Sequence, residues 1–179
     1  MRFFVTRHGE TDWNVLDKVC GRTEAELTDN GRRQAAELAD RLADKNIDVI
    51  VSSPMKRAYE TSRIIAERCG IADIETDDRL IEQDYGIYEG VDRRDQGFLG
   101  NKRNFAFRYP NGESMMQVAY RTYGLLEELR KRYCGRNVLI VCHGGVCRVI
   151  NTYFRDMTNE EFFNYSLENC GVEEYDVRD

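Results

Sequence analysis

The chain contains two histidines, and both occupy the same kind of position in the sequence. His8 and His143 each follow a short apolar run and each precede glycine. Histidine is the side chain best suited to nucleophilic or acid–base work near neutral pH, and glycine lets backbone amides approach a ligand closely. This shared pattern predicts an active site that contains both histidines.

Arginines flank these segments and favour an anionic ligand. Arg7 precedes His8, and Arg22 and Arg57 lie between the two histidines in the chain. Imidazoles, guanidinium groups and the amides at helix starts suit a tetrahedral oxyanion, because together they bind several of its oxygens. Phosphate is the expected ligand. One histidine can attack phosphorus while the other stabilises the charge that develops in the transfer.

An acidic cluster offers the third chemical role. A leaving alkoxide needs a proton, and the cluster contains the carboxyl groups of Glu82, Asp84 and Glu89. Each can act as a general acid if burial raises its pKa. From the residue types alone, the choice among the three stays open.

The elements that must position these residues alternate along the chain. Short apolar, β-rich runs are predicted to be buried strands at 2–6, 47–51 and 137–142. Helices are expected at about 28–45, from a cap at Ser53 to about 70, at 113–133 and at 145–155. This alternation predicts an α/β fold, a three-layer α/β/α sandwich with a mostly parallel central sheet. Ligands bind at the carboxyl ends of the strands in such sheets, so the marked segments should meet in one crevice.

Length and pattern predict a single domain over residues 1–179, with a lid or insertion at about 84–112. This stretch holds glycines, aromatics and basic residues without a clean strand period. Its basic residues suit either a solvated surface or the recognition of a second anionic group: Arg93, Arg94, Lys102, Arg103 and Arg108. Beyond about Asp156 we expect a closing helix and an edge strand.

Composition excludes several classes of protein. A net charge of −6 argues against a nucleic-acid or anionic-membrane binder, and no apolar stretch approaches the length of a membrane helix. No export signal is recognisable at the amino terminus, so a cytoplasmic location and free thiols at the six cysteines are expected. Two histidines and no CxxC pair predict no metal site, and no cofactor is expected. The sequence does not indicate an oligomeric state.

The motifs resemble those of the histidine phosphatase superfamily, also called phosphoglycerate mutase-like. Its signature is Arg-His-Gly near the amino terminus, which is found here at Arg7, His8 and Gly9. The resemblance continues through Ser52-Ser53-Pro54 and an acid-bearing segment around Glu82, and it closes at His143-Gly144-Gly145. It covers about residues 2–152, which is nearly the whole chain.

The resemblance implies a role for each matching residue. His8 resembles the nucleophile that becomes phosphohistidine, and Glu82 resembles the proton donor. The implied phosphate-binding residues are Arg7, Asn14, Gly21, Arg22, Arg57, His143 and Gly144. No metal is needed in that scheme, because arginines supply the positive charge and histidine supplies the attacking atom.

Three hypotheses follow for the function. The first is a metal-independent phosphatase that hydrolyses a small phosphate monoester through phosphohistidine, which the short chain favours. The second is a phosphoglycerate mutase that transfers phosphate between substrate hydroxyls. The third is a phospho-ligand binder that has lost turnover, which the complete set of candidate residues disfavours.

Overall fold

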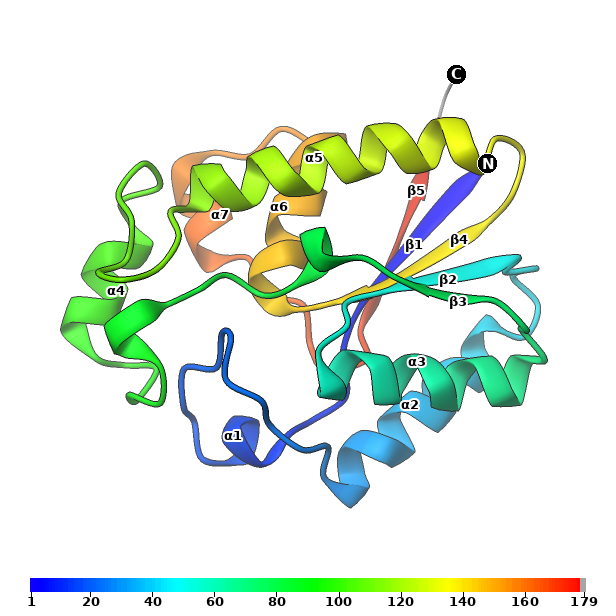
Figure 1. Ribbon diagram of the computed structural model, residues 1–179, viewed down its shortest axis with the longest axis horizontal. Helices are drawn as coiled ribbons and strands as arrows, with labels where there is room; N and C mark the ends of the chain where they lie inside the picture. The colour runs from blue at the N-terminus through cyan, green and yellow to red at the C-terminus, as the bar shows by residue number, and fades with distance from the viewer. Residues whose placement is uncertain (178–179) are drawn as a thin grey trace.

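A five-stranded sheet forms the centre of the computed structural model, which describes residues 1–177 (Figure 1). The strands lie in the order β3-β2-β4-β1-β5. Four of them run parallel, and β5 pairs antiparallel with β1 at one edge. Their bounds are β1 Arg2–Arg7, β2 Val49–Ser52, β3 Ile74–Thr76, β4 Val138–Cys142 and β5 Val172–Asp176. The mostly parallel sheet is therefore confirmed.

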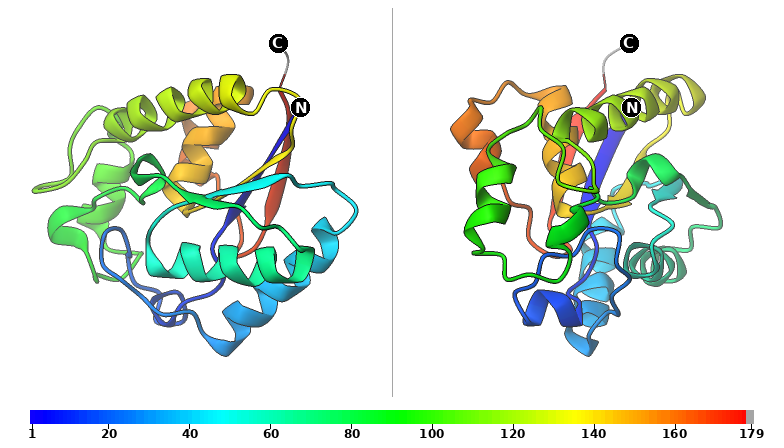
Figure 2. Two further views of the ribbon diagram at one scale, coloured as in Figure 1. Left: turned by 45° about the vertical axis from the view of Figure 1, so that its right-hand side comes forward. Right: turned by 60° about the vertical axis from the view of Figure 1, so that its left-hand side comes forward.

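Helices cover both faces of the sheet, as Figures 1 and 2 show. Apolar residues of α2 (Asp29–Leu42) and α3 (Lys56–Cys69) pack with Phe4 and Ile50 on one face. On the other face, α5 (Met115–Arg132) and α6 (Gly144–Phe154) pack with the alternate strand residues Phe3, Val5 and Ile140. Successive strand residues point to opposite faces, so both sides of the sheet bury apolar surface. The three-layer sandwich is confirmed.

Local hydrogen bonds explain where two of these helices begin. The Thr28 hydroxyl accepts the Gly31 amide proton at the start of α2 (3.0 Å). Ser114 and Gln117 form a reciprocal capping box at the start of α5. In both cases the side chain satisfies an amide that lacks a partner inside the helix.

The predicted start of α3 at Ser53 is wrong. The helix begins at Lys56, and Met55 precedes it without a side-chain cap. The Ser53 hydroxyl instead accepts the Met55 amide proton across a turn (3.3 Å). Ser53 therefore stays outside the helix, at the carboxyl end of β2.

Short elements account for most of what the sequence pattern did not predict. A three-residue strand or a single helical turn is too short to show a period. The short elements that were not predicted are β3, α1 (Asp12–Val15), η1 (Asp78–Leu80), η2 (Gly86–Tyr88) and the seven-residue α4 (Gln96–Lys102). The closing helix and edge strand expected near the carboxyl terminus are present as α7 (Asn159–Asn164) and β5.

The segment 84–112 lies beside the end of the sheet where β1 and β4 finish, around α4 in Figure 1. It has a small apolar cluster of its own, in which Val19 packs with Phe98 and Tyr109. The Tyr85 ring meets the Phe98 and Tyr109 rings edge to face, with centroids 5.3 and 5.2 Å apart. Such contacts stabilise an aromatic cluster beyond the area that it buries. The segment therefore has a packed interior that is separate from the two main apolar clusters.

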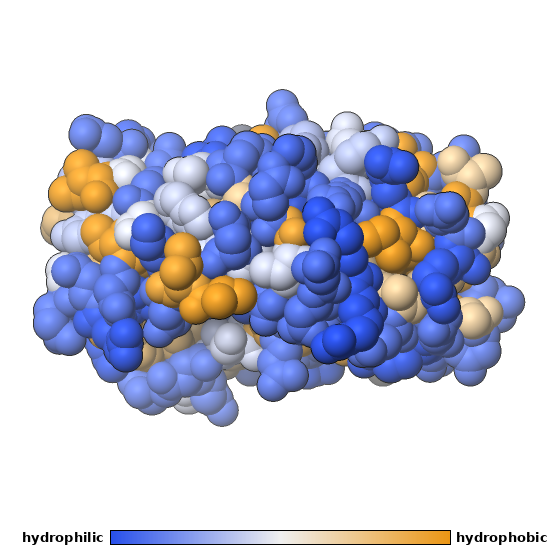
Figure 3. All heavy atoms as spheres, turned by 90° about the horizontal axis from the view of Figure 1, so that it is seen from below, coloured by the Kyte–Doolittle hydropathy of each residue, from blue (hydrophilic) through white to orange (hydrophobic). Residues whose placement is uncertain are grey.

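No helix among residues 1–177 is both long and apolar enough to cross a membrane. The face seen in Figure 3 is mostly hydrophilic, with separate apolar patches.

We predict that Gly31→Ala destabilises the protein, because a methyl group there would meet the carbonyl oxygen of Glu10. The free energy of unfolding should fall by about 1–3 kcal/mol, measured by urea denaturation. Gly124→Ala is the matched control, because a methyl group at this glycine of α5 meets nothing within 4 Å. The control should gain up to about 1 kcal/mol from helix propensity. Equal stability of the two variants would contradict the proposed contact.

Candidate active site

The candidate site forms where β1, β2 and β4 end side by side. Arg7 pairs with Cys142 in the sheet register, so His8 and His143 follow at the same level. The His8 amide donates to the Cys142 carbonyl (3.0 Å), and the Ser53 amide donates to the Val141 carbonyl (2.9 Å). The two imidazole centroids lie 5.2 Å apart. Three segments that are far apart in the sequence therefore converge, as predicted.

Hydrogen bonds fix the tautomer of His8. Its Nδ1 lies 2.7 Å from the Gly9 carbonyl oxygen, which can only accept, so Nδ1 carries the proton. The Arg57 Nε donates to the other ring nitrogen, Nε2 (3.3 Å). Burial, Arg57 and Arg7 hold the pKa of His8 well below its usual value. The ring is therefore neutral at pH 7, with a lone pair on Nε2.

His143 is fully buried and has one ring nitrogen without a partner in the described structure. Its Nε2 lies 2.8 Å from the Ser53 hydroxyl, and its Nδ1 has no hydrogen bond. The Ser53 hydroxyl accepts from Met55 with one lone pair and can donate its proton to Nε2, an arrangement that corresponds to the Nδ1–H tautomer of His143. Burial and Arg57 hold the pKa of His143 well below its usual value. A neutral ring then carries its proton on Nδ1, as a donor for an anion.

Arg57 contacts His8 at Nε2 and also binds a loop. The residue is 1% exposed, and its guanidinium donates to the Thr23 and Gly21 carbonyls (3.0 and 2.8 Å). Gly21 thus contributes a backbone oxygen that holds Arg57. The side chain of Arg57 joins His8 to the loop at residues 21–23.

Two further predicted residues line the cavity beside His8. Arg7 donates to the Leu167 carbonyl (3.1 Å), and its buried Nε has no hydrogen-bond partner among the described residues. The Asn14 side-chain oxygen, Oδ1, accepts from the Thr11 amide (3.0 Å) and from the Asn169 side chain (3.2 Å). Asn169 also donates to the His8 carbonyl (2.9 Å). Arg7 therefore retains a donor for an anion, and Asn14 is held in place by its oxygen.

Glu82 is the member of the acidic cluster that reaches the cavity. It is 5% exposed, and its two oxygens accept from the Gly145 amide (3.0 Å) and the Gln83 amide (2.8 Å). A Cβ on Gly145 would lie 2.6 Å from the carboxylate, so glycine there permits this close approach. A protonated carboxyl group keeps acceptor capacity on both oxygens and can direct its O–H into the cavity.

The other two members of the cluster are occupied elsewhere. The Glu89 carboxylate accepts from the Gly21 and Arg22 amides (3.0 Å each). An Asp84 oxygen accepts from the Gly86 amide (2.9 Å). Neither residue lines the cavity. Glu89 acts as a structural link between the 84–112 segment and the loop that Arg57 holds.

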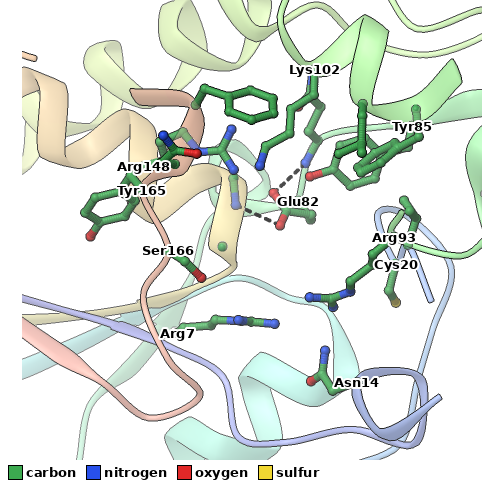
Figure 4. Close-up of a pocket in the computed structure, with 18 of the residues that line it drawn as sticks. Arg7, Asn14, Cys20, Glu82, Tyr85, Arg93, Lys102, Arg148, Tyr165 and Ser166 are labelled. Carbon is green, nitrogen blue, oxygen red and sulfur yellow. Dashed lines mark hydrogen bonds between the residues drawn. The ribbon is translucent and has the colours of Figure 1, made fainter. Parts of the chain in front are cut away.

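The cavity has a volume of about 280 Å³. Its walls come from β1, from α6, from the 84–112 segment and from the turn after α7 (Figure 4). Gly144 lies in the wall at the start of α6, beside Arg7. No group of three or more His, Cys, Asp or Glu side chains in the described part of the chain is arranged to hold a metal ion.

Comparison with known proteins identifies the family. The model of the histidine phosphatase superfamily (branch 1) matches residues 3–179. The chain belongs to the histidine phosphatase superfamily.

Curated relatives in this superfamily include phosphatases and mutase-like proteins. Phosphoserine phosphatase 1 of Hydrogenobacter thermophilus is 31% identical over 95% of this chain and 83% of its own. A protein of Bacillus subtilis described as uncharacterized phosphatase PhoE is 38% identical over 83% of this chain and 74% of its own. Phosphoglycerate mutase-like protein 4 of Arabidopsis thaliana is 35% identical over 80% of this chain and 66% of its own.

Solved structures of the same family superpose closely. Bacillus stearothermophilus YhfR has a TM-score of 0.88 at 28% identity and covers 99% of this chain and 91% of its own. Mycobacterial glucosyl-3-phosphoglycerate phosphatase in complex with VO3 has a TM-score of 0.86 at 29% identity, over 97% and 90%. The predicted family and the enzyme class, a phosphoric monoester hydrolase of the histidine phosphatase type, are confirmed.

Four predicted residues of this histidine phosphatase do not line the cavity: Gly21, Arg22, Arg57 and His143. Arg57 contacts His8, and the His143 ring lies beside the His8 ring, whereas the Arg22 side chain turns away from the site. The Arg22 guanidinium pairs with Glu113 (3.2 Å), and only the Arg22 amide contacts the site framework, through Glu89. A basic residue beside a motif glycine therefore gave a misleading indication, because the side chain turns towards the 84–112 segment.

Several residues that line the cavity were not predicted from the sequence. Arg148 lies three residues after Gly145, so helix periodicity places both on one face of α6 and could have indicated it. Tyr165 and Ser166 come from the turn after α7, and no local pattern marks them. They reach the cavity only because β5 brings the end of the chain back beside β1.

The two neutral histidines make stability depend on pH. An unfolded histidine takes up a proton near pH 6.5, whereas the folded rings stay neutral, so acid favours the unfolded state. Between pH 6.5 and 5.5, each histidine should remove about 1 kcal/mol from the free energy of unfolding, measured by urea denaturation. His8→Asn should lose about half of this pH dependence. An unchanged pH dependence in that variant would contradict a neutral His8.

Proposed function

We propose that the protein is a metal-independent phosphatase that hydrolyses a small phosphate monoester through a phosphohistidine intermediate at His8. The observation that carries the proposal is the tautomer of His8: Nδ1 donates to the Gly9 carbonyl, so Nε2 holds the lone pair. This lone pair accepts from Arg57 Nε, and Nε2 becomes the attacking atom when the phosphate takes that donor. Arg7 lines the cavity together with His8, and the His143 ring centroid lies 5.2 Å from that of His8. Such an arrangement stabilises charge where it develops in phosphoryl transfer.

In the first step, His8 Nε2 forms a bond to phosphorus and the ester P–O bond breaks. The electron pair of that bond goes to the leaving oxygen, which takes a proton from Glu82. Arg7, Arg57 and the His143 Nδ1–H balance the charge on the remaining phosphate oxygens.

In the second step, water attacks the phosphorus and the P–N bond breaks. The Glu82 carboxylate accepts the proton of the attacking water, and inorganic phosphate and neutral His8 are restored. A mutase shares the first step and differs only in the acceptor, which is a second substrate hydroxyl. Phosphoserine phosphatase 1, which matches nearly the whole chain, supports water as the acceptor here.

The nucleophile is tested with His8→Asn. With p-nitrophenyl phosphate in excess chelator, kcat should fall by at least about a thousandfold, because the covalent route is removed. Rapid-quench samples of wild type should contain an acid-labile, alkali-stable phosphoenzyme that is absent from the variant. Retained turnover in the variant would contradict the proposal.

Two other outcomes would identify the alternative hypotheses. Formation of 2-phosphoglycerate from 3-phosphoglycerate, stimulated by trace bisphosphoglycerate, would show a mutase. Tight binding of phosphate esters without turnover or phosphoenzyme would show a binding protein.

The proton donor is tested with Glu82→Gln. For an alkyl phosphate, kcat/KM should fall by about a hundredfold or more, because the alkoxide leaves without a proton. For p-nitrophenyl phosphate, whose leaving group needs no proton, the loss should stay below about tenfold. Steady-state rates on the two esters measure the difference. Equal losses would contradict the acid role and would favour a purely structural one.

A further inference from the structure

The cavity carries more positive charge than one phosphate group needs. Arg7, Arg93, Lys102 and Arg148 line it, and Glu82 is the single carboxylate among the described lining residues. A phosphate monoester brings between one and two negative charges at neutral pH. Arg7, together with Arg57 behind His8, already balances them. Further cations are therefore left for another anion.

Arg148 has no acidic partner. The residue on α6 is 8% exposed, and neither a salt bridge nor a hydrogen bond joins its guanidinium to another described residue. Its Nε is buried, and its guanidinium lies over the Phe162 ring, 5.3 Å from the centroid. Burying an unpaired charge is costly, and a cation–π contact offsets only part of that cost. A ligand anion is the group that would pair with it.

Lys102 shares this arrangement from a different element. It lies at the end of α4, with its Nζ over the Phe163 ring at 4.5 Å, and pairs with no carboxylate in residues 1–177. Burial and the neighbouring Arg148 lower the pKa of Lys102 to about 8. The adjacent Arg103 differs, because it pairs with Glu160 (3.4 Å) and does not line the cavity.

Figure 4 shows how these cations lie relative to the proposed chemistry. Arg148 and Lys102 point into the cavity on the Glu82 side, while Arg7 and Asn14 lie on the opposite side. The Arg93 guanidinium extends towards Arg7 and Asn14, at the phosphate end. Because Glu82 must meet the ester oxygen, the alcohol part of the substrate extends from there towards Arg148 and Lys102.

We propose that the substrate is a small phosphate monoester whose alcohol part carries a second anionic group, a carboxylate or a second phosphate, bound by Arg148 and Lys102. This inference rests on the proposed function, since it uses the positions of His8 and Glu82 to orient the ester. A guanidinium and an ammonium group together bind either anion by charge-assisted hydrogen bonds. A cavity of about 280 Å³ suits a small ester.

A matched series of three-carbon esters tests the second anion. Glycerol 3-phosphate, 3-phosphoglycerate and glycerol 1,3-bisphosphate differ in carrying a hydroxymethyl group, a carboxylate or a phosphate at the far carbon. Wild type should show a kcat/KM at least about tenfold higher for one of the two charged esters than for glycerol 3-phosphate. The preferred ester identifies the anion. Equal values for all three would overturn the proposal.

Substitutions test which residues cause the preference for a charged ester. Arg148→Met and Lys102→Met should each reduce the ratio of the charged to the uncharged ester by at least about threefold. Arg103→Met is the matched control and should leave the ratio unchanged. An equal loss on all three esters in the Arg148 and Lys102 variants would assign these cations to the phosphate or to folding, and would overturn the proposal.

Binding of ligands that cannot be hydrolysed tests the second anion site independently of the proposed phosphatase activity. Calorimetry with 3-phosphonopropionate and propylphosphonate compares ligands with and without a carboxylate, and neither is hydrolysed. The carboxylated ligand should bind wild type at least about tenfold more tightly, and Arg148→Met should lose that difference. If no ester were hydrolysed, the proposed function would fail, yet this result would still support the second anion site. Equal binding of both ligands would overturn the site.

Discussion

The parallel pairing of β1 with β4 is the constraint on which the site depends. With Arg7 opposite Cys142, the chain leaves both strands at one level, and the two histidines follow at once. The buried runs Phe3–Val5 and Val138–Cys142 hold this register through both faces of the sheet. A slip of one residue would turn every side chain of β1 to the wrong face. The same apolar burial therefore stabilises the fold and positions the chemistry.

Around this pair, the site consists of neutral imidazoles among permanent cations. Neutral rings are what such surroundings favour, because a charged imidazole would be both buried and repelled. In the proposed mechanism, the arginines balance the charge of the anion, one histidine provides a lone pair and the other provides a proton. Hydrogen bonds to the Gly9 carbonyl and the Ser53 hydroxyl then divide these two roles between the rings.

The sequence predicted the long elements well because their apolar periods are long enough to read. It also predicted the convergence of His8, Ser53 and His143, since the carboxyl ends of parallel strands lie at one edge of a sheet. Residue types alone could not choose among Glu82, Asp84 and Glu89, because that choice depends on which backbone amides each carboxylate meets. The family resemblance was needed to select Glu82. Tyr165 and Ser166 could not be predicted either, because only the return of β5 places their turn at the cavity.

The Glu89 carboxylate has a consequence for how the cavity is covered. It accepts hydrogen bonds from amides of the 21–23 loop, and Arg57 donates to carbonyls of the same loop. One end of the 84–112 segment is therefore linked, through this loop, to Arg57 beside His8. The other end, at α4, contacts α7 through the exposed ion pair between Arg103 and Glu160. Lys102 and Arg103 also lie over the Phe163 ring. Separating exposed ion pairs of this kind costs little free energy, whereas breaking a buried hydrogen-bond network costs more. The segment 84–112 is therefore held more firmly at its Glu89 end than at α4, so the α4 end is the one whose contacts cost less free energy to break.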